Sequence, residues 1–272
     1  MIVVASYSMS PSASLSASEI QFVKEAQAFL ENPSFLMKAA NLVGKPLDRG
    51  LKMLPAGVQT KIHGAVESSM KKGLEVVSKS VVQEAKSFEG AIESSRKQGW
   101  FHTAASFGTG ALGGFFGVAS LPIELPVTTA IMLRSIVSTA RDFGHDISSP
   151  DVQLECLYVL SLGSSGDKAV NSAYWTSRLA FTDIIRQAAR EIEKTSGPLL
   201  VRFLAQVAAR FELVVSEKAM AELVPVVGAL GGGAINAAFS EHFNTAARFH
   251  FGIRALEKKH GEDVVQAAYL QT

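Results

Sequence analysis

The amino-acid sequence predicts a single-domain, all-α protein, and three observations support this fold class. Apolar residues recur with the 3.6-residue period of a helix along most of the chain. No stretch between turn residues alternates polar and apolar side chains as a half-buried strand would. No linker rich in proline, glycine or charge divides the 272 residues. We therefore expect one multi-helix domain with two glycine-rich apolar helices packed at its centre.

Composition and charge narrow the class of function. The chain is 47% hydrophobic but only 19% charged, which predicts a large core, an interface or contact with a bilayer. Its net charge is +1, so no overall electrostatic field draws it to nucleic acid. The single cysteine, Cys156, excludes an internal disulfide and fits a reducing compartment. These features predict a cytoplasmic protein that does not bind nucleic acid.

The N-terminal part is predicted to contain a leader over residues 1–17, followed by amphipathic helices over residues 18–98. Residues 1–17 are rich in serine and have no basic residue before a short apolar stretch, so they predict a disordered leader rather than a signal peptide. The first helix is expected to begin at Ser18, with Gln21 at the capping-box position. A short helix follows, and an apolar stripe beyond Pro55 fits one long helix or two stacked ones. The stripe contains Ile62, Val66, Met70, Leu74, Val77, Val81, Phe88 and Ile92.

Residues 99–272 are predicted to form the helical core, which includes two glycine-rich segments. Residues 101–123 and 223–240 contain no Asp, Glu, Lys or Arg. Glycines four residues apart open a groove without side chains, through which a second helix can approach closely. This pattern fits three arrangements: a tight helix crossing in a soluble core, conditional insertion into a bilayer, and a permanent transmembrane span. The polar residues and glycines within the two segments favour the soluble core. The packing glycines are Gly110, Gly113, Gly114, Gly117, Gly228 and Gly232.

The segments around these glycines also show helical periodicity. Beyond Pro126, apolar residues continue at helical spacing up to Gly144, which is placed to end a helix. The second glycine-rich segment leads into a polar helix that ends near His260. Between them, helices are predicted at Pro150–Leu162, Asp167–Lys194 and Pro198–Met220.

A basic surface is predicted between residues 45 and 72. Six cations occur there against only Asp48 and Glu67, and they flank a stripe of leucines. A basic amphipathic helix lies readily on an anionic membrane leaflet, with about 1 kcal/mol from each cation near the surface. The alternative is a solvated outer face of the helical bundle. The membrane-contact candidates are Lys45, Arg49, Lys52, Lys61, Lys71 and Lys72.

Polar residues in apolar surroundings form a second group of candidates. Glu124 is a charge between two prolines beside an apolar segment. Because an unpaired charge there would be costly, we expect it to contact Arg134, Arg141 or free backbone amides. The amide of Asn236 is expected to bridge backbone groups of neighbouring helices. A structural role is favoured for both residues over ligand binding.

Local motifs for enzyme chemistry and for metal binding are absent from the sequence. His242 and His250 lie about 12 Å apart along a helix, so the pair cannot hold one metal ion. The run 163–166 lacks the spacing of a nucleophile elbow, and the run 110–114 lacks the lysine of a phosphate loop. Cys156 lies in an apolar helical pattern typical of an inert core thiol. We therefore predict no cofactor and no metal.

Three runs of residues resemble the bacterial EcsC family. They are LPVTTAIMLRSIVSTARDFGHD (125–146), CLYVLSLG (156–163) and VPVVGALGGGAINAAFSEHFNTAARFHFGIRALEKKHG (224–261), within a resemblance that covers residues 90–261. The family takes its name from the third gene of an operon that also encodes an ABC exporter, so the resemblance implies transport or envelope work. It supplies no reaction and no catalytic residue. The matching polar positions, candidates for a ligand-binding or structural cluster, are Glu124, Arg134, Asn236, His242, His250, Arg254 and Glu257.

These features predict a non-enzymatic helical protein that associates peripherally with the inner face of the cytoplasmic membrane and serves envelope or transport processes. Two alternatives stay open. One is a soluble helical protein that binds a lipid or another apolar ligand in an internal groove. The other is an enzyme whose site assembles Glu124, Arg134 and His242 from distant positions. The sequence does not define an oligomeric state.

Overall fold

Helices account for most of the chain that the computed structural model describes. The described residues are 14–31, 56–79, 86–97, 120–162, 173–192, 197–222 and 229–271. Within these ranges the structure contains helices and turns but no strand, which confirms the predicted all-α class.

The helices follow one another in the predicted order, with one addition. That addition is α10 (Glu262–Leu270), which the periodicity did not predict. The described elements are α1 (Ala17–Leu30), α3 (Ala56–Ser78), a helix at residues 88–97, α5 (Leu121–Asp142), α6 (Pro150–Tyr158) with a 3-10 turn at Val159–Ser161, α7 (Ala173–Ala189), α8 (Pro198–Glu222), α9 (Ala229–His260) and α10.

The first helix begins two residues earlier than predicted. Ser16, not Ser18, is its N-cap: the Glu19 amide donates to Ser16 Oγ at 3.3 Å, and the Ser16 amide donates to Glu19 Oε2 at 2.7 Å. Ser16 and Ser18 each have a possible capping-box partner three residues further on, Glu19 and Gln21 respectively. The carboxylate of Glu19 is a stronger acceptor than the amide of Gln21, and it also suits the positive end of the helix dipole. Gln21 instead donates to Glu25 at 3.0 Å.

Several predictions concern residues outside the described ranges. One is the predicted disordered leader, of which residues 1–13 lie outside the described part. For residues 14–17 that prediction is wrong, because Leu15 is buried in the core and Ala17 opens α1. The predictions outside the described ranges also include the short helix that follows α1 in the prediction and the first glycine-rich segment up to residue 119. Gly232 lies in α9, but its surroundings are not described. Other predicted residues outside the described part are Gly110, Gly113, Gly114, Gly117, Gly228, Lys45, Arg49 and Lys52.

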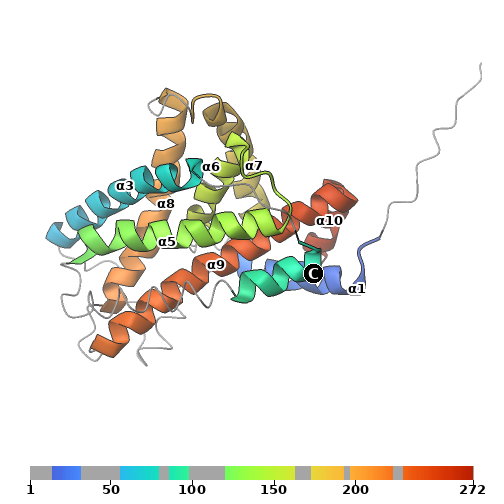
Figure 1. The fold of residues 1–272 in the computed structure, drawn as a ribbon, viewed down its shortest axis with the longest axis horizontal. Helices are drawn as coiled ribbons and strands as arrows, with labels where there is room; N and C mark the ends of the chain where they lie inside the picture. Colours follow the sequence, from blue (N-terminus) through green and yellow to red (C-terminus); the bar gives the residue numbers. More distant parts are fainter. Residues whose placement is uncertain are drawn as a thin grey trace, which may run out of the picture.

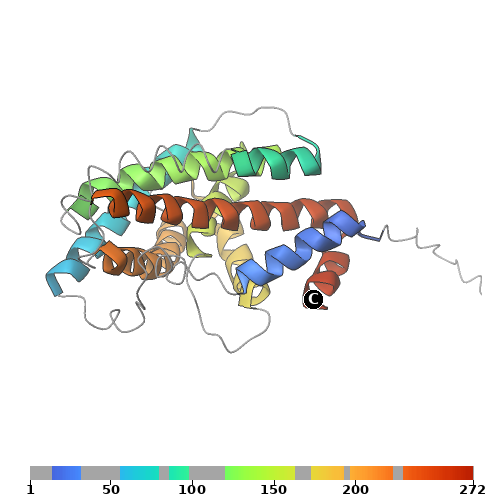
Figure 2. The ribbon, with the colours of Figure 1, turned by 90° about the horizontal axis from the view of Figure 1, so that it is seen from below.

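The long helix α9 organises the fold and runs lengthwise through it (Figure 1). Helix α5 packs along α9, and α3 packs against α5, α6 and α8. Helices α1 and α10 pack near the C-terminal end of α9, as Figure 2 shows from below. The buried apolar side chains of these helices form one cluster, so the described helices share one core.

The apolar stripe predicted beyond Pro55 is buried as expected. It lies in α3 up to Val77 and continues in the separate helix at residues 88–97, where Phe88 and Ile92 are partly buried against the core. The described residues therefore favour two helices over one long one. In α3 the buried members are Ile62, Val66, Met70, Leu74 and Val77.

Gly73 lies where α3 packs closely against α5 and α6. A Cβ atom at this position would lie 2.7 Å from Leu133 Cδ1 in α5 and 2.9 Å from Leu157 Cδ2 in α6. A Cβ atom at this position would therefore require the ends of both leucine side chains to shift, whereas glycine fits without that shift. This close approach compensates for the cost of about 1 kcal/mol that glycine imposes inside a helix.

One helix among the described residues, α5, is long and apolar enough to cross a membrane. Its most apolar window has a mean hydropathy of 1.3, and 56% of that window is buried inside the protein. Core helices of soluble proteins meet the same criterion of length and composition. The burial of α5 against α3 and α9 is that of a core helix.

Candidate functional site

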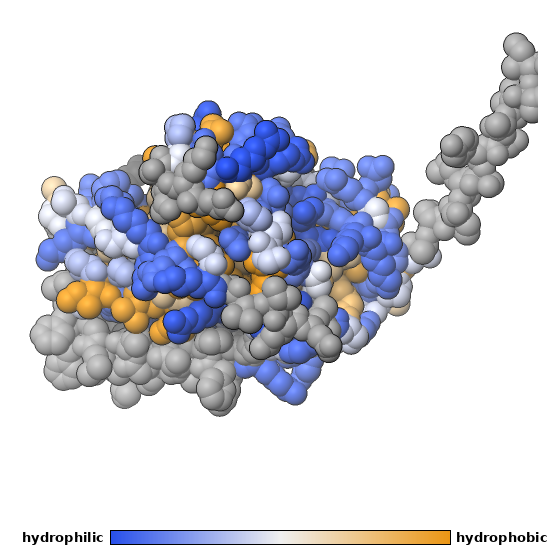
Figure 3. Space-filling model, turned by 45° about the horizontal axis from the view of Figure 1, so that its top comes forward, coloured by the Kyte–Doolittle hydropathy of each residue, from blue (hydrophilic) through white to orange (hydrophobic). Residues whose placement is uncertain are grey.

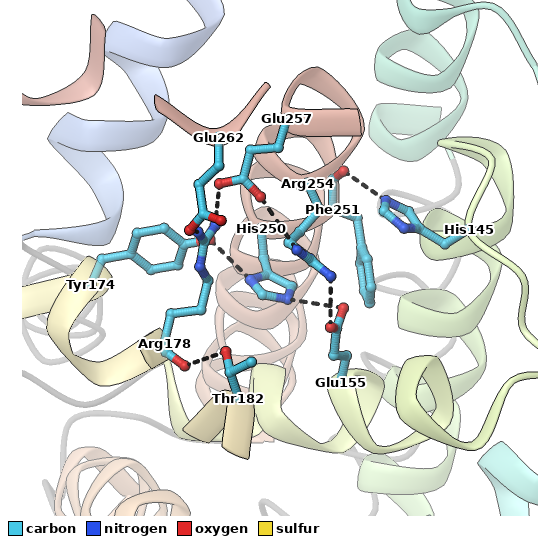
Figure 4. A network of polar contacts seen from close by, with 10 residues as sticks. All are labelled: His145, Glu155, Tyr174, Arg178, Thr182, His250, Phe251, Arg254, Glu257 and Glu262. Atoms are coloured by element: carbon cyan, nitrogen blue, oxygen red, sulfur yellow. Dashed lines mark hydrogen bonds and ion pairs between the residues drawn. The ribbon is translucent and has the colours of Figure 1, made fainter. Parts of the chain in front are cut away.

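A network of charged side chains joins α6, α7, α9 and α10 (Figure 4). Arg178 of α7 lies between two carboxylates, with Nη1 2.6 Å from Glu257 Oε1 and Nη2 3.1 Å from Glu262 Oε1. Arg254 of α9 lies between Glu155, at 3.1 Å, and Glu257, at 3.4 Å. Glu257 therefore contacts both arginines and links the two halves of the network.

His250 lies in the interior of this network. Its Nδ1 is 3.0 Å from the Tyr174 hydroxyl, and its Nε2 is 3.8 Å from Glu155 Oε2. Because a carboxylate only accepts hydrogen bonds, both neighbours suit a ring that carries its proton on Nε2 and accepts from Tyr174 at Nδ1. Burial lowers the pKa of His250 below its ordinary value, which favours the neutral ring. Burial alone would raise the pKa of Glu155, but His250 and Arg254 hold it at about 2.

The inner part of this network is shielded from solvent, which favours a structural role for it. Arg178, His250 and Glu257 are each at most 8% exposed, so a substrate has no direct access to them. Among the described residues, no three His, Cys, Asp or Glu side chains are placed to hold a metal ion. Cys156 is buried nearby in α6, and burial raises the pKa of its thiol, which agrees with the predicted inert core cysteine.

Glu124 belongs to a separate buried ion pair. Its Oε1 accepts from Lys218 Nζ of α8 at 2.8 Å, and the two side chains are 7% and 1% exposed. The expectation that Glu124 contacts Arg134 or Arg141 is wrong. Arg134 is exposed and lies ten residues further along the same helix, a rise of about 15 Å. Arg141 lies 3.6 Å from Asp142 instead.

The other predicted polar residues of α9 are in the core. Asn236 and His242 are both fully buried. The His242 ring packs against Phe29 of α1, with ring centroids 5.5 Å apart. Arg134 is exposed whereas Glu124 and His242 are buried against different helices, which weighs against an enzyme site shared by these three.

A second region of interest, the α3–α5 surface, combines basic and apolar side chains. At the start of α5, Ile123 is 80% exposed and Val127 is 48% exposed. Two predicted membrane-contact residues, Lys71 and Lys72, line a hollow of 410 Å³ beside Val127. A third, Lys61, is exposed further back along α3. The α3–α5 surface is defined here as Ser68, Lys71, Lys72, Glu75, Val76, Lys79, Ile123, Pro126, Val127 and Arg134.

A second hollow on this surface, of 240 Å³, is more strongly basic. It is lined by Val76, by Arg134 of α5, and by Lys72, Glu75 and Lys79 of α3. Glu75 accepts from Lys72 at 2.8 Å and from Lys79 at 2.9 Å, and these two lysines lower the pKa of Glu75 to about 2. Helical spacing of three and four residues brings the three charges together on one face of α3.

The half-buried side chain of His145 makes the stability of the fold depend on pH. The Gly144 turn, with φ of 78°, directs His145 toward α9, where its Nε2 donates to the Phe251 carbonyl at 2.9 Å. Burial lowers its pKa from 6.5 to about 4. Between these values the unfolded chain holds a proton that the folded chain does not, so stability falls as the pH decreases through this window.

The expected loss from His145 is on the order of 2 kcal/mol, after allowance for its partial exposure. Urea unfolding measured above pH 6.5 and near pH 4 tests it. The control variant His145→Gln keeps an N–H donor for the carbonyl but does not titrate, so its stability should depend less on pH. Equal pH dependence in the two proteins would contradict this role for His145.

The fold and these two regions define a class: an all-α domain with charged clamps in its interior and a basic, apolar surface between two helices. A model of the EcsC protein family matches residues 18–256. The chain therefore belongs to the EcsC protein family, as the three resembling runs predicted. The match begins earlier than the predicted resemblance and includes α1, which packs on α9 within the same core. Comparison with curated proteins and with solved structures finds no match.

Proposed function

We propose that the protein binds peripherally to anionic membranes through the α3–α5 surface, at the inner face of the cytoplasmic membrane. The observation that carries the proposal is Ile123, a large apolar side chain that is 80% exposed next to a lysine-lined hollow. Single exposed apolar side chains are common on soluble proteins, but this one shares the first turns of α5 with the exposed Val127, which lies beside the lysines of the hollow. Figure 3 shows hydrophobic surface on the left of the molecule, where Figure 1 places the start of α5, directly beside hydrophilic side chains.

The charges of this surface support the same function. Lys71 contacts Glu67 at 2.9 Å with both side chains more than half exposed, and such surface pairs contribute little to folding. Basic side chains beside an exposed apolar one are the combination that interfacial binding uses, because the cations attract anionic headgroups and the apolar group enters the acyl boundary. The expected binding is reversible, because most of α5 is buried in the core and its exposed large apolar side chains, Ile123 and Val127, both lie in its first turns.

A role in envelope or transport processes is part of this proposal and is supported by the family resemblance alone. Membrane attachment would place the protein beside the transport machinery that the resemblance implies.

The variant Ile123→Ser tests the apolar half of the proposal. Burying an isoleucine side chain contributes about 1.5–3 kcal/mol, so the variant is expected to lower affinity for anionic vesicles at least about tenfold. Flotation of purified protein with vesicles of phosphatidylcholine and phosphatidylglycerol measures the change. High salt should weaken binding of the unaltered protein, because it screens the lysines.

The matched control is Leu179→Ser, which removes a comparably exposed side chain (58%) from α7. It should bind vesicles as the unaltered protein does. Equal losses in the two variants would show that Ile123 has no special contact with the membrane. Failure of the unaltered protein to float with any vesicle would overturn the proposal.

A further inference from the structure

We infer that the two hollows of the α3–α5 surface together bind one anionic phospholipid with a phosphomonoester headgroup. The phosphate lies among Lys72, Lys79 and Arg134, and the apolar part follows Pro126 and Val127. This inference rests on the proposed function and adds the class of lipid that the membrane surface must supply.

The charges around the smaller hollow favour a doubly charged anion. Three cations and the single carboxylate of Glu75 line it, which leaves a formal charge of +2. Lys72 and Lys79 share that carboxylate, whereas Arg134 has no hydrogen-bond or ion-pair partner among the described residues. A guanidinium presents parallel N–H donors that match phosphate oxygens. A phosphomonoester carries about −1.5 to −2 at neutral pH and so complements this charge.

The larger hollow explains why the ligand should be a lipid rather than free phosphate. The two hollows share Lys72 and Glu75, so they lie next to each other. The larger one adds Pro126 and Val127, beyond which Ile123 is 80% exposed. Arg134 follows Val127 by seven residues, which places the two on one face of α5 with a rise of about 10 Å between them. A lipid bound by its phosphate at Arg134 can cover these apolar side chains, whereas free phosphate cannot.

The experiment compares two kinds of vesicle at equal surface charge: phosphatidylcholine mixed with phosphatidic acid, and phosphatidylcholine mixed with phosphatidylglycerol. The unaltered protein is expected to bind phosphatidic acid more tightly by about tenfold or more, because a hydrogen bond to a charged group contributes that much. Arg134→Gln should abolish this preference while retaining weaker binding to both vesicles. Arg134 is exposed, so the variant should fold normally, which circular dichroism checks.

Arg202→Gln is the matched control, because Arg202 is also exposed but lies on α8. It should keep the preference for phosphatidic acid. Val127→Ser should weaken binding to both vesicles by a similar factor, because it alters only the apolar part of the site. Inorganic phosphate should compete only weakly, since it lacks that part.

Three outcomes would overturn the inference. The first is equal binding of the unaltered protein to the two anionic vesicles. The second is a preference for phosphatidic acid that survives Arg134→Gln. The third is full competition by inorganic phosphate, which would identify free phosphate as the ligand. Each leaves the proposed membrane binding intact, whereas failure to bind either vesicle would remove both proposals.

Discussion

Replacing Glu124 with alanine is expected to lower the free energy of unfolding by about 3–5 kcal/mol. Lys218 is 1% exposed, and its ammonium lies 2.8 Å from the Glu124 carboxylate. Removing that carboxylate breaks a buried ion pair from one side, and this is costly because the desolvated ammonium loses the close charge of Glu124. Urea unfolding followed by circular dichroism measures the change.

The double variant Glu124→Leu/Lys218→Met distinguishes the contribution of the ion pair to stability from that of the packing around it. Exchanging a buried ion pair for apolar side chains of similar volume is often neutral or stabilising, so the double variant should be more stable than Glu124→Ala. Lys71→Ala serves as the control, because the pair between Lys71 and Glu67 is exposed and should contribute less than about 1 kcal/mol. Similar losses in Glu124→Ala and Lys71→Ala would contradict the buried position of Glu124.

The fold class could be predicted because helical periodicity is a local property. The apolar stripe in α3 could be recognised in the sequence because its residues recur at helical spacing and face the same core. Helix α10 was missed because it has only 9 residues, of which Val265 and Tyr269 alone are buried, and follows Gly261, which looks like the end of α9. With φ of 94°, Gly261 turns the chain so that α10 folds back onto α9.

The candidate site was less predictable because its contacts join distant parts of the chain. The sequence shows that Glu124 needs a partner, but Lys218 is 94 residues away and its choice depends on how α5 and α8 cross. His250 and Arg254 were identified by resemblance, whereas Arg178, one of the residues that bind this part of α9, was missed. A usable signal was present, since Arg178 follows the aromatic pair Tyr174 and Trp175, which a buried arginine can stack on.

The basic surface, likewise, could be predicted only in part from the sequence. Lys71 and Lys72 could be selected from the charge pattern alone, because their side chains occupy the polar face of a strongly periodic helix. The exposure of Ile123 could not, since it belongs to an uncharged segment that the sequence assigns to the core. An apolar run without clear periodicity does not show which of its side chains faces outward.

Arg178→Ala is expected to destabilise the fold by about 3–5 kcal/mol, because three interactions of one buried side chain are lost together. Its guanidinium pairs with Glu257 at 2.6 Å and with Glu262 at 3.1 Å, and its Cζ lies 3.9 Å from the centre of the Trp175 ring. Trp175 in turn stacks on Tyr269 of α10, with centroids 5.2 Å apart. The variant therefore loosens both α9 and α10 from α7, and thermal or urea unfolding measures the loss.

Two further variants show which property of Arg178 matters. Arg178→Lys keeps the charge but cannot hold two carboxylates and stack on an indole ring at once, so it should fall between the native protein and Arg178→Ala. Arg186→Ala removes an arginine from the same helix, but its pair with Asp183 is 63% and 77% exposed and should contribute less than about 1 kcal/mol. If Arg178→Ala cost no more than Arg186→Ala, the clamp would contribute nothing beyond a surface pair, and apolar packing alone would hold α7, α9 and α10 together.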